Sequence, residues 1–319
     1  MRIVFMGTPQ FAVPSLQAVV EAGHDVVLVV TQPDRPAGRG KQLQAPPVKQ
    51  EALARGLEVV QPTSMRDPDV QAKLESLRPD AACVVAFGAM LPPSILNLGR
   101  FGCINVHPSL LPEYRGAAPI QRAIMDGRIE TGVTTMFLSE EMDAGDIILQ
   151  QRVTIEPDED SGSLHDRLAA IGARLLVDTL AALEQGTAPR IPQDHTAATY
   201  APKIGPEDER LNWQLPAFQL HNVIRGLRPR PGAYTYFRGK RLKIWRSQVD
   251  DRVSGAEPGE IVAVEKNAIH VQTGEGILLL TELQPENGKR LTADAFCNGH
   301  RVEVGERLGR LDSGEVENV

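Results

Sequence analysis

The first 31 residues constrain the fold more than any other part of the sequence. Residues 2–6 (RIVFM) are a short β-forming run closed by Gly7, residues 11–22 have the apolar spacing of a helix, and residues 24–31 (HDVVLVVT) are typical of a second strand. A strand, a helix and a strand in this order predict a βαβ unit. The chain is therefore expected to build a parallel sheet with helices on its faces.

The rest of the chain is expected to form two domains, as its 319 residues allow. Strands predicted at 81–88 and 101–107 and a helix from 163 to about 184 continue the α/β pattern, so residues 1–188 form the first domain. Residues 189–206 are rich in Pro, Thr and Ala without a hydrophobic period, which is typical of a linker. Regularly spaced short β-rich runs then predict a small β-barrel or sandwich over 207–312.

The composition is that of an ordinary soluble protein. No apolar run approaches the roughly 20 residues of a membrane helix, and the chain begins directly with a strand, so a cytoplasmic location and no membrane partner are expected. Cys83, Cys103 and Cys297 lack C-x-x-C spacing. They indicate neither a disulfide framework nor a zinc site, and we expect small buried side chains and no metal.

Charge is strongly segregated along the chain. The net charge is −7, yet no acidic residue lies between Arg210 and Val249, a stretch that we call the basic island. A second basic segment, residues 32–49, carries four cations against Asp34 and is too long for a routine connection. A solvated surface could explain the island, but both segments are also what a polyanionic partner requires.

Asn105 and His107 form the strongest candidate for chemistry, in the run INVHPSLLP. Side chains alternate along a strand, so these two point to one face about 6.6 Å apart. They lie at the carboxyl end of a predicted parallel strand, where ligands collect in open α/β sheets. Either residue alone could be structural; together they indicate a site.

A carboxylate is needed to orient the imidazole, and SEEMDAGDI supplies two, Asp143 and Asp146, between which spacing does not choose. An amide, an imidazole and a carboxylate without a nucleophilic Ser or Cys can hold a carbonyl oxygen, stabilise an oxyanion and move a proton. The pattern therefore predicts acyl transfer without a covalent enzyme intermediate.

Four stretches closely resemble the methionyl-tRNA formyltransferase family: FMGTPQFAVPSL, TQPDRPAGRGKQL, INVHPSLLPEYRGAAPIQRAI and ETGVTTMFLSEEMDAGDI. The resemblance covers nearly the entire chain. It implies a Rossmann-like domain followed by a small OB-like β-barrel domain. The implied reaction, part of translation initiation, transfers the formyl group of 10-formyltetrahydrofolate to the α-amino group of methionyl initiator tRNA.

The resemblance also implies roles for particular residues. Asn105, His107 and Asp143 match the family's catalytic positions, which selects Asp143 over Asp146. Ser109, Leu110, Leu111 and Pro112 match the folate-contacting loop, and Ala86, Phe87, Gly88 and Met90 are expected to line the pterin pocket. The tRNA is expected to contact the basic segment 32–49 and the basic island, at Arg35, Arg39, Lys41, Arg225, Arg228, Arg230, Lys240 and Arg241.

Two positions depart from the family pattern. Pro108 follows His107 where a small residue is common, which stiffens the loop, and Arg230 stands where an aromatic residue is common. Other acceptors, such as glycinamide ribonucleotide or an amino sugar, remain alternatives, as does a non-catalytic tRNA- or folate-binding module. A dehydrogenase is disfavoured because the turn at Gly7 lacks G-x-G-x-x-G. The chain is expected to act as a monomer.

Overall fold

The computed structural model describes residues 1–37, 42–252 and 254–309. These residues form two compact units. The first unit comprises Met1–Pro119, Glu130–Thr154 and His165–Ala201. The second comprises Ile120–Ile129, Ile155–Leu164 and the chain from Pro202 onward, so two short segments that precede Pro202 in the sequence also belong to it.

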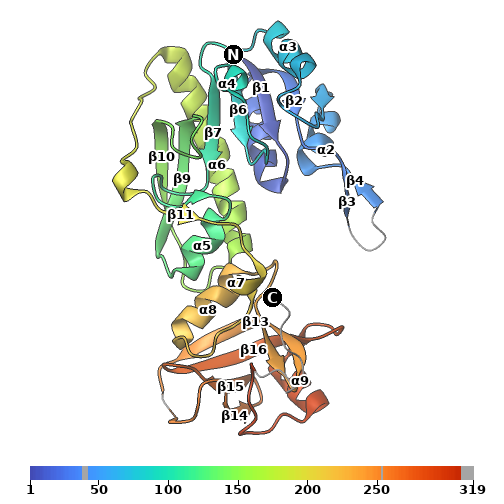
Figure 1. Cartoon of the computed structure of the whole chain (residues 1–319), viewed down its shortest axis with the longest axis vertical. Coiled ribbons are helices and arrows are strands. Elements are labelled where there is room, and N and C mark those ends of the chain that lie inside the picture. Colours follow the sequence, from blue (N-terminus) through green and yellow to red (C-terminus); the bar gives the residue numbers. More distant parts are fainter. Residues whose placement is uncertain (38–41, 253, 310–319) are drawn as a thin grey trace. The chain divides into compact units, whose positions relative to one another are not determined.

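The first unit is built on a seven-stranded sheet of order β10-β9-β7-β6-β1-β2-β5 (Figure 1). Its strands are β1 (Arg2–Gly7), β2 (Asp25–Val30), β5 (Val59–Val60), β6 (Ala81–Val85), β7 (Cys103–His107), β9 (Glu130–Phe137) and β10 (Ile147–Thr154). Its helices are α1 (Val13–Glu21), α2 (Pro47–Ala54), α3 (Pro68–Ser76), α4 (Pro93–Leu96) and the main part of α6 (Ser161–Gln185).

The predicted βαβ unit is confirmed by β1, α1 and β2, with β1 pairing in parallel with both β2 and β6. The expected parallel sheet holds from β7 to β5. At the other edge the sheet is mixed, because β9 runs antiparallel to β7 and β10 runs antiparallel to β9. A short connection suffices between antiparallel strands, so no crossover helix separates β9 from β10.

Helix α6 covers the face of the sheet opposite to the candidate site. A Cβ on Gly172 would lie 2.8 Å from a methyl group of Val106, and the hydroxyl groups of Thr135 and Thr179 are 2.7 Å apart. Figure 1 shows α6 beside β7, β9 and β10. Since side chains alternate along β7, Asn105 and His107 must face away from α6.

The basic segment 32–49 contains a short β-hairpin, β3 (Arg35–Ala37) paired with β4 (Gln42–Gln44). Arg35 on this hairpin is exposed, whereas Arg39 and Lys41 lie outside the described residues. Lys49 forms an ion pair with Asp34 at 2.8 Å, so the one carboxylate of the segment connects its first residues to its last.

The predicted linker is packed against the first unit over most of its length. Ile191 forms a bridge with Ile147, and β11 (Tyr200–Ala201) pairs with β8 (Arg115–Gly116). We call residues 189–201 the strap. It carries few apolar side chains and is held by backbone pairing, which explains why a hydrophobic pattern did not reveal it.

The second unit is a small antiparallel barrel with helices. Its sheet has the order β12-β13-β16-β15-β14, with β17 on β16. The elements are α5 (Pro119–Met125), α7 (Pro206–Glu209), α8 (Ala217–Gly226), β12 (Tyr234–Phe237), β13 (Lys240–Asp250), β14 (Ile261–Glu265), β15 (Ala268–Gln272), β16 (Ile277–Pro285), β17 (Leu291–Thr292) and α9 (Ala293–His300).

Residues 306–309 close this barrel. Leu308 bridges Phe237 beside one edge of the sheet, and Arg307 bridges Glu260 beside the other. The predicted small β-barrel is thereby confirmed, because closure removes both open edges. Its interior is apolar and includes Leu220, Ile244 and Leu280.

The three cysteines are free thiols, and the expectation of buried side chains is confirmed for Cys83 and Cys103 but wrong for Cys297. Cys83 and Cys103 are buried, and burial raises the pKa of Cys103 to about 12, so this thiol stays neutral. Cys297 is half-buried. Within the described ranges, no helix has the length and apolar character needed to cross a bilayer.

Candidate active site

Strand β7 presents Asn105 and His107 to one face at its carboxyl end. Both are almost fully buried, and they pair with Met136 and Thr134 of β9. The alternation inferred from the sequence is therefore present in the structure. Among the residues that the structure describes, the side-chain amide of Asn105 has no hydrogen-bond partner, so its N–H groups are not engaged by the protein.

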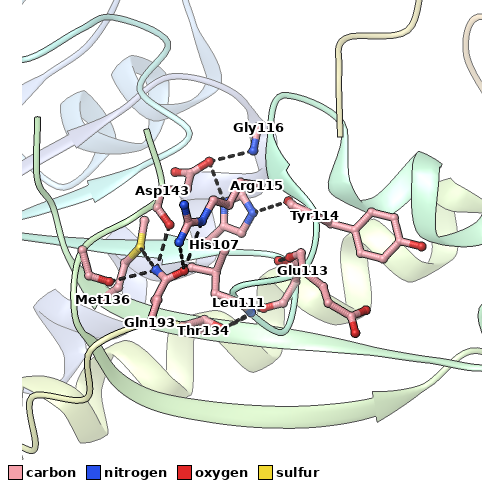
Figure 2. Close-up of polar contacts among 12 residues, drawn as sticks. His107, Leu111, Glu113, Tyr114, Arg115, Gly116, Thr134, Met136, Asp143 and Gln193 are labelled. Atoms are coloured by element: carbon pink, nitrogen blue, oxygen red, sulfur yellow. Dashed lines mark hydrogen bonds and ion pairs between the residues drawn. The ribbon is translucent and has the colours of Figure 1, made fainter. Parts of the chain in front are cut away.

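The imidazole of His107 lies between two oxygen acceptors (Figure 2). Nε2 is 2.9 Å from the carbonyl oxygen of Tyr114, and Nδ1 is 3.7 Å from Oδ2 of Asp143. Because a carbonyl oxygen can only accept a hydrogen bond, Nε2 carries a proton and donates a hydrogen bond to the carbonyl of Tyr114. Nδ1 then faces the carboxylate.

Asp143 is brought to His107 by the turn that connects β9 to β10. Its Oδ2 atom also accepts a hydrogen bond of 2.8 Å from the backbone N–H of Gly116. Asp146, the alternative left open by spacing, points elsewhere, with its carboxylate 3.3 Å from Arg190. The structure thus places Asp143, and not Asp146, beside the imidazole.

The turn that carries Asp143 depends on Gly145. A Cβ on Gly145 would lie 1.9 Å from the carbonyl oxygen of Phe137, closer than any real contact. Phe137 in turn donates its backbone N–H to the carbonyl of Asp146. Only glycine fits where the turn passes the end of β9.

The loop 109–112 is held by hydrogen bonds to Glu113 and to Thr134 of β9. The hydroxyl of Ser109 donates to the carbonyl of Glu113 at 2.7 Å, and the N–H of Leu111 donates to Thr134 Oγ1. Ser109 and Leu111 are buried, whereas Leu110 and Pro112 are half-buried. The loop is therefore rigid, with the Ser109 hydroxyl engaged in holding it.

The strand end after β6 divides into buried and exposed side chains. Phe87 is buried in the core, and its carbonyl accepts a hydrogen bond from the hydroxyl of Thr8. Ala86, Gly88 and Met90 are exposed, and Ala86 has a positive φ of 45°. Of the residues expected to line the pterin pocket, these three are the accessible ones.

Two residues of the site were not found by the sequence analysis. Arg115 is 1% exposed and donates from Nε and Nη2 to the amide oxygen of Gln193, at 3.1 and 2.7 Å (Figure 2). The Gln193 amide nitrogen donates to the carbonyls of Asp143 and Gly145, each at 2.8 Å. Gln193 was missed because it lies in the predicted linker, residues 189–206, which has no hydrophobic period.

The cations expected to meet tRNA fall into two groups. Arg225 is buried and bonds to Asn222 and to the carbonyls of Glu156 and Glu159, and Arg228 forms a 2.6 Å ion pair with Asp160. These two side chains hold the segment 155–164 within the second unit.

The remaining cations of this set are accessible. Arg230 and Lys240 are exposed. Arg241 is partly exposed, lies 3.7 Å from the centre of the Tyr234 ring and pairs with Glu209 at 2.9 Å.

Neither a metal-binding cluster among the described residues nor the pocket of the second unit coincides with this site. Over the described ranges, no group of three or more His, Cys, Asp or Glu side chains could hold a metal ion. A pocket of about 800 Å³ lies in the second unit, lined by residues that include Arg210, Trp213 and Arg307. It contains none of the three candidate catalytic residues.

Comparison with known proteins identifies both parts of the chain. Residues 1–180 match the family described as formyl transferase, and residues 203–301 match the family described as formyl transferase, C-terminal domain. The methionyl-tRNA formyltransferase of Moorella thermoacetica is 52% identical over 97% of this chain and 99% of its own length. That of Symbiobacterium thermophilum is 53% identical over 99% and 98%.

Solved structures share the fold at low sequence identity. An N-formyltransferase from Helicobacter canadensis, in complex with folinic acid and dTDP-3-aminofucose, has a TM-score of 0.67 at 17% identity and covers 91% of this chain and 99% of its own. HypX from Aquifex aeolicus, in complex with tetrahydrofolic acid, has a TM-score of 0.60 at 20% identity over 96% of this chain and 48% of its own.

Proposed function

The chain belongs to the methionyl-tRNA formyltransferase family, and we propose that Asn105, His107 and Asp143 carry out its reaction. It is a formyltransferase that uses formyltetrahydrofolate and acts on methionyl-tRNA. In the proposed reaction, the α-amino group of methionine on initiator tRNA attacks the formyl carbon of 10-formyltetrahydrofolate. The bond from that carbon to N10 then breaks.

One observation carries the assignment of the site. The His107 imidazole lies 3.7 Å from the Asp143 carboxylate. Asn105 lies on the same face of β7 as His107, and among the described residues its side-chain amide has no hydrogen-bond partner. An oxyanion donor, a proton-transfer group and a carboxylate are thus gathered at one end of β7. These are the groups that a tetrahedral intermediate of acyl transfer requires.

Each group has a separate role in the proposed mechanism. Attack of the amine makes the formyl oxygen negative, and the Asn105 amide donates to it. The amine must lose a proton and N10 must gain one, and His107 relays this proton through Nδ1, because Nε2 already donates to the carbonyl of Tyr114. When the ring holds the extra proton, Tyr114 accepts from Nε2 and Asp143 accepts from Nδ1, so both N–H groups face oxygen.

The folate is proposed to lie against two rigid segments beside β7. Loop 109–112 and the accessible residues Ala86, Gly88 and Met90 both follow strands that end at the same edge of the sheet. Ligands of open α/β sheets bind at such an edge. The half-buried Leu110 and Pro112 are the loop side chains that we expect to contact the folate.

The tRNA is proposed to contact the exposed cations. Arg35 on the β3-β4 hairpin of the first unit, and Arg230, Lys240 and Arg241 in the second unit, remain accessible. Arg225 and Arg228 are excluded from this proposal because their guanidinium groups are already bonded to protein oxygens. Accessible cations can bind backbone phosphates without regard to sequence.

The variant His107→Ala tests the proposed function. We expect turnover to fall by about 10²- to 10⁴-fold, the usual contribution of a general acid–base group, while binding of methionyl-tRNA is retained. Formyl-methionine on tRNA is measured by mass after incubation with the formyl donor. His195→Ala, an exposed position, serves as the control.

Two outcomes would contradict this proposal. Wild-type turnover in His107→Ala would remove the imidazole from the mechanism. Formylation of a nucleotide-linked amino sugar by the wild-type chain, with none of methionyl-tRNA, would assign another acceptor to it.

A further inference from the structure

The strap, residues 189–201, contacts Asp143 and Tyr114, the two residues whose oxygen atoms face the His107 imidazole. Gln193 lies beside the turn that carries Asp143, and Thr199 lies beside Tyr114, whose carbonyl accepts from His107. Backbone pairing at both ends, Ile191 with Ile147 and Tyr200 with Arg115, fixes the strap in this place.

The amide of Gln193 has only one possible orientation. The guanidinium of Arg115 can only donate, so the group it contacts must be the amide oxygen. The carbonyls of Asp143 and Gly145 can only accept, so the group that they face must be the amide nitrogen. Gln193 is 6% exposed, and both of its amide protons are used.

Asp143 needs this support because its backbone is strained. Its φ is 53°, in the left-handed region that a non-glycine residue rarely adopts. The carbonyl of Asp143 is bound by Gln193, and its carboxylate is bound by the N–H of Gly116. The residue is therefore held from both its main chain and its side chain.

The partner of His107 is supported in the same way. Tyr114 also has a positive φ, 59°, and its N–H donates to Thr199 Oγ1 at 2.9 Å. Its carbonyl accepts from His107 Nε2. One segment of chain thus holds the acceptors on both sides of the imidazole.

We propose that Gln193, carried by the strap and anchored by Arg115, is a positioning residue for formyl transfer that fixes the Asp143 carboxylate against His107. This inference rests on the proposed function, since it assumes that Asp143 takes part in the reaction. Gln193 does not touch the reacting atoms. It acts by keeping the 3.7 Å geometry between carboxylate and imidazole.

The variant Gln193→Glu keeps the hydrogen bonds that Gln193 accepts from Arg115 and removes those that it donates to Asp143 and Gly145. The new carboxylate can still accept hydrogen bonds from Arg115. It has no N–H group, so an oxygen atom now faces the carbonyl oxygens of Asp143 and Gly145, and the two hydrogen bonds to them are lost. We expect kcat to fall by about 10- to 100-fold, as misplacement of a catalytic group does. KM for both substrates should stay within about twofold, because neither binding surface is altered.

A double-mutant cycle distinguishes positioning from a general structural role. If Gln193 acts through Asp143, then Gln193→Glu has no further effect on kcat in an Asp143→Asn background. Two effects that multiply would overturn the proposal, as would a wild-type kcat in Gln193→Glu. His195→Ala, two residues away on the strap, is the matched control.

Stability is checked by thermal unfolding. If Gln193→Glu does not fold, Gln193→Met, which has a similar volume and no charge, replaces it. If neither variant folds, Gln193 is required for the fold itself, and the proposal is overturned. The proposed function is judged on a different variant. Wild-type kcat in Asp143→Asn would remove Asp143 from the mechanism, whatever Gln193→Glu shows.

Discussion

At the scale of single residues, Gly145 shows how closely the site depends on its backbone. The Asp143 turn passes the carbonyl of Phe137 at a distance that admits no side chain. The same turn places the carbonyls of Asp143 and Gly145 side by side for Gln193. Gly145, which has no reactive side chain, therefore determines the position of the Asp143 carboxylate.

We predict that Gly145→Ala lowers both stability and activity. The new Cβ would meet the Phe137 oxygen, so the turn must move, at a cost of about 1–3 kcal/mol in the free energy of unfolding. Because Asp143 moves with the turn, kcat should fall by about 10²-fold. Urea unfolding and mass detection of formyl-methionine measure the two effects.

The control for this substitution is Gly299→Ala. Gly299 lies in α9 with nothing within 4 Å of an added Cβ, so alanine there should leave kcat unchanged and keep or raise stability. Equal behaviour of the two alanine variants would show that the turn tolerates displacement.

At the scale of elements, an ion pair connects two helices of the second unit. Arg122 of α5 binds both carboxylate oxygens of Asp208 in α7, each at 2.6 Å. Asp208 Oδ2 also accepts from the N–H of Gly205 at the start of α7. The hydrogen bond from Arg122, followed by that from Gly205, holds the pKa of Asp208 below its usual value of 3.8.

We predict that Asp208→Asn destabilises the chain at neutral pH but not in strong acid. A carboxyl with a depressed folded pKa contributes stability above its unfolded pKa, and this stability is lost as the pH falls through the folded pKa. The loss should be about 1–3 kcal/mol near pH 7 and should disappear well below pH 3.8. Urea unfolding at both pH values measures it.

Glu207→Gln, on the exposed side of the same short helix, is the control. It should change stability little at either pH. A difference between wild type and Asp208→Asn that persists unchanged in acid would contradict the role given to the ion pair.

At the scale of the whole molecule, the basic island is less positive than its sequence suggests. Acids from outside the island neutralise its cations. Four such pairs are Arg228 with Asp160, Arg238 with Glu306, Arg241 with Glu209 and Arg246 with Glu282. Within the described ranges, Arg230 and Lys240 have no ionic partner, and they are the cations best able to bind phosphate.

We predict that formylation of methionyl-tRNA weakens steeply with salt, whereas binding of the folate does not. Each neutralised phosphate contributes about 0.7 to 0.9 to the slope of log affinity against log salt. Arg230→Ala and Lys240→Ala should each reduce the slope by about this amount. Titration of tRNA binding at several salt concentrations measures it.

Lys266→Ala, an exposed cation outside the island, is the control and should leave the slope unchanged. If tRNA binding and folate binding depend on salt to the same extent, Arg230 and Lys240 do not contact the phosphates of the tRNA. Arg225→Ala should instead lower stability, because it removes a hydrogen-bond donor from the part-buried carbonyls of Glu156 and Glu159.

The sequence by itself determined the α/β first domain, the β-rich second domain and the face that Asn105 and His107 share. These features follow from local periodicity: apolar spacing sets the element, and alternation along a strand sets the face. The resemblance of its motifs then supplied the reaction and selected Asp143. None of this required knowing how distant segments meet.

Only the tertiary structure decided which polar groups support the site. Arg115 and Gln193 are 78 positions apart, and their contact depends on a strap that no hydrophobic period marks. The acids that neutralise the basic island lie 32 to 68 positions from the cations with which they pair. Hydrogen bonds and ion pairs leave no periodic signal in a chain, because any segment that the fold brings near can supply the partner.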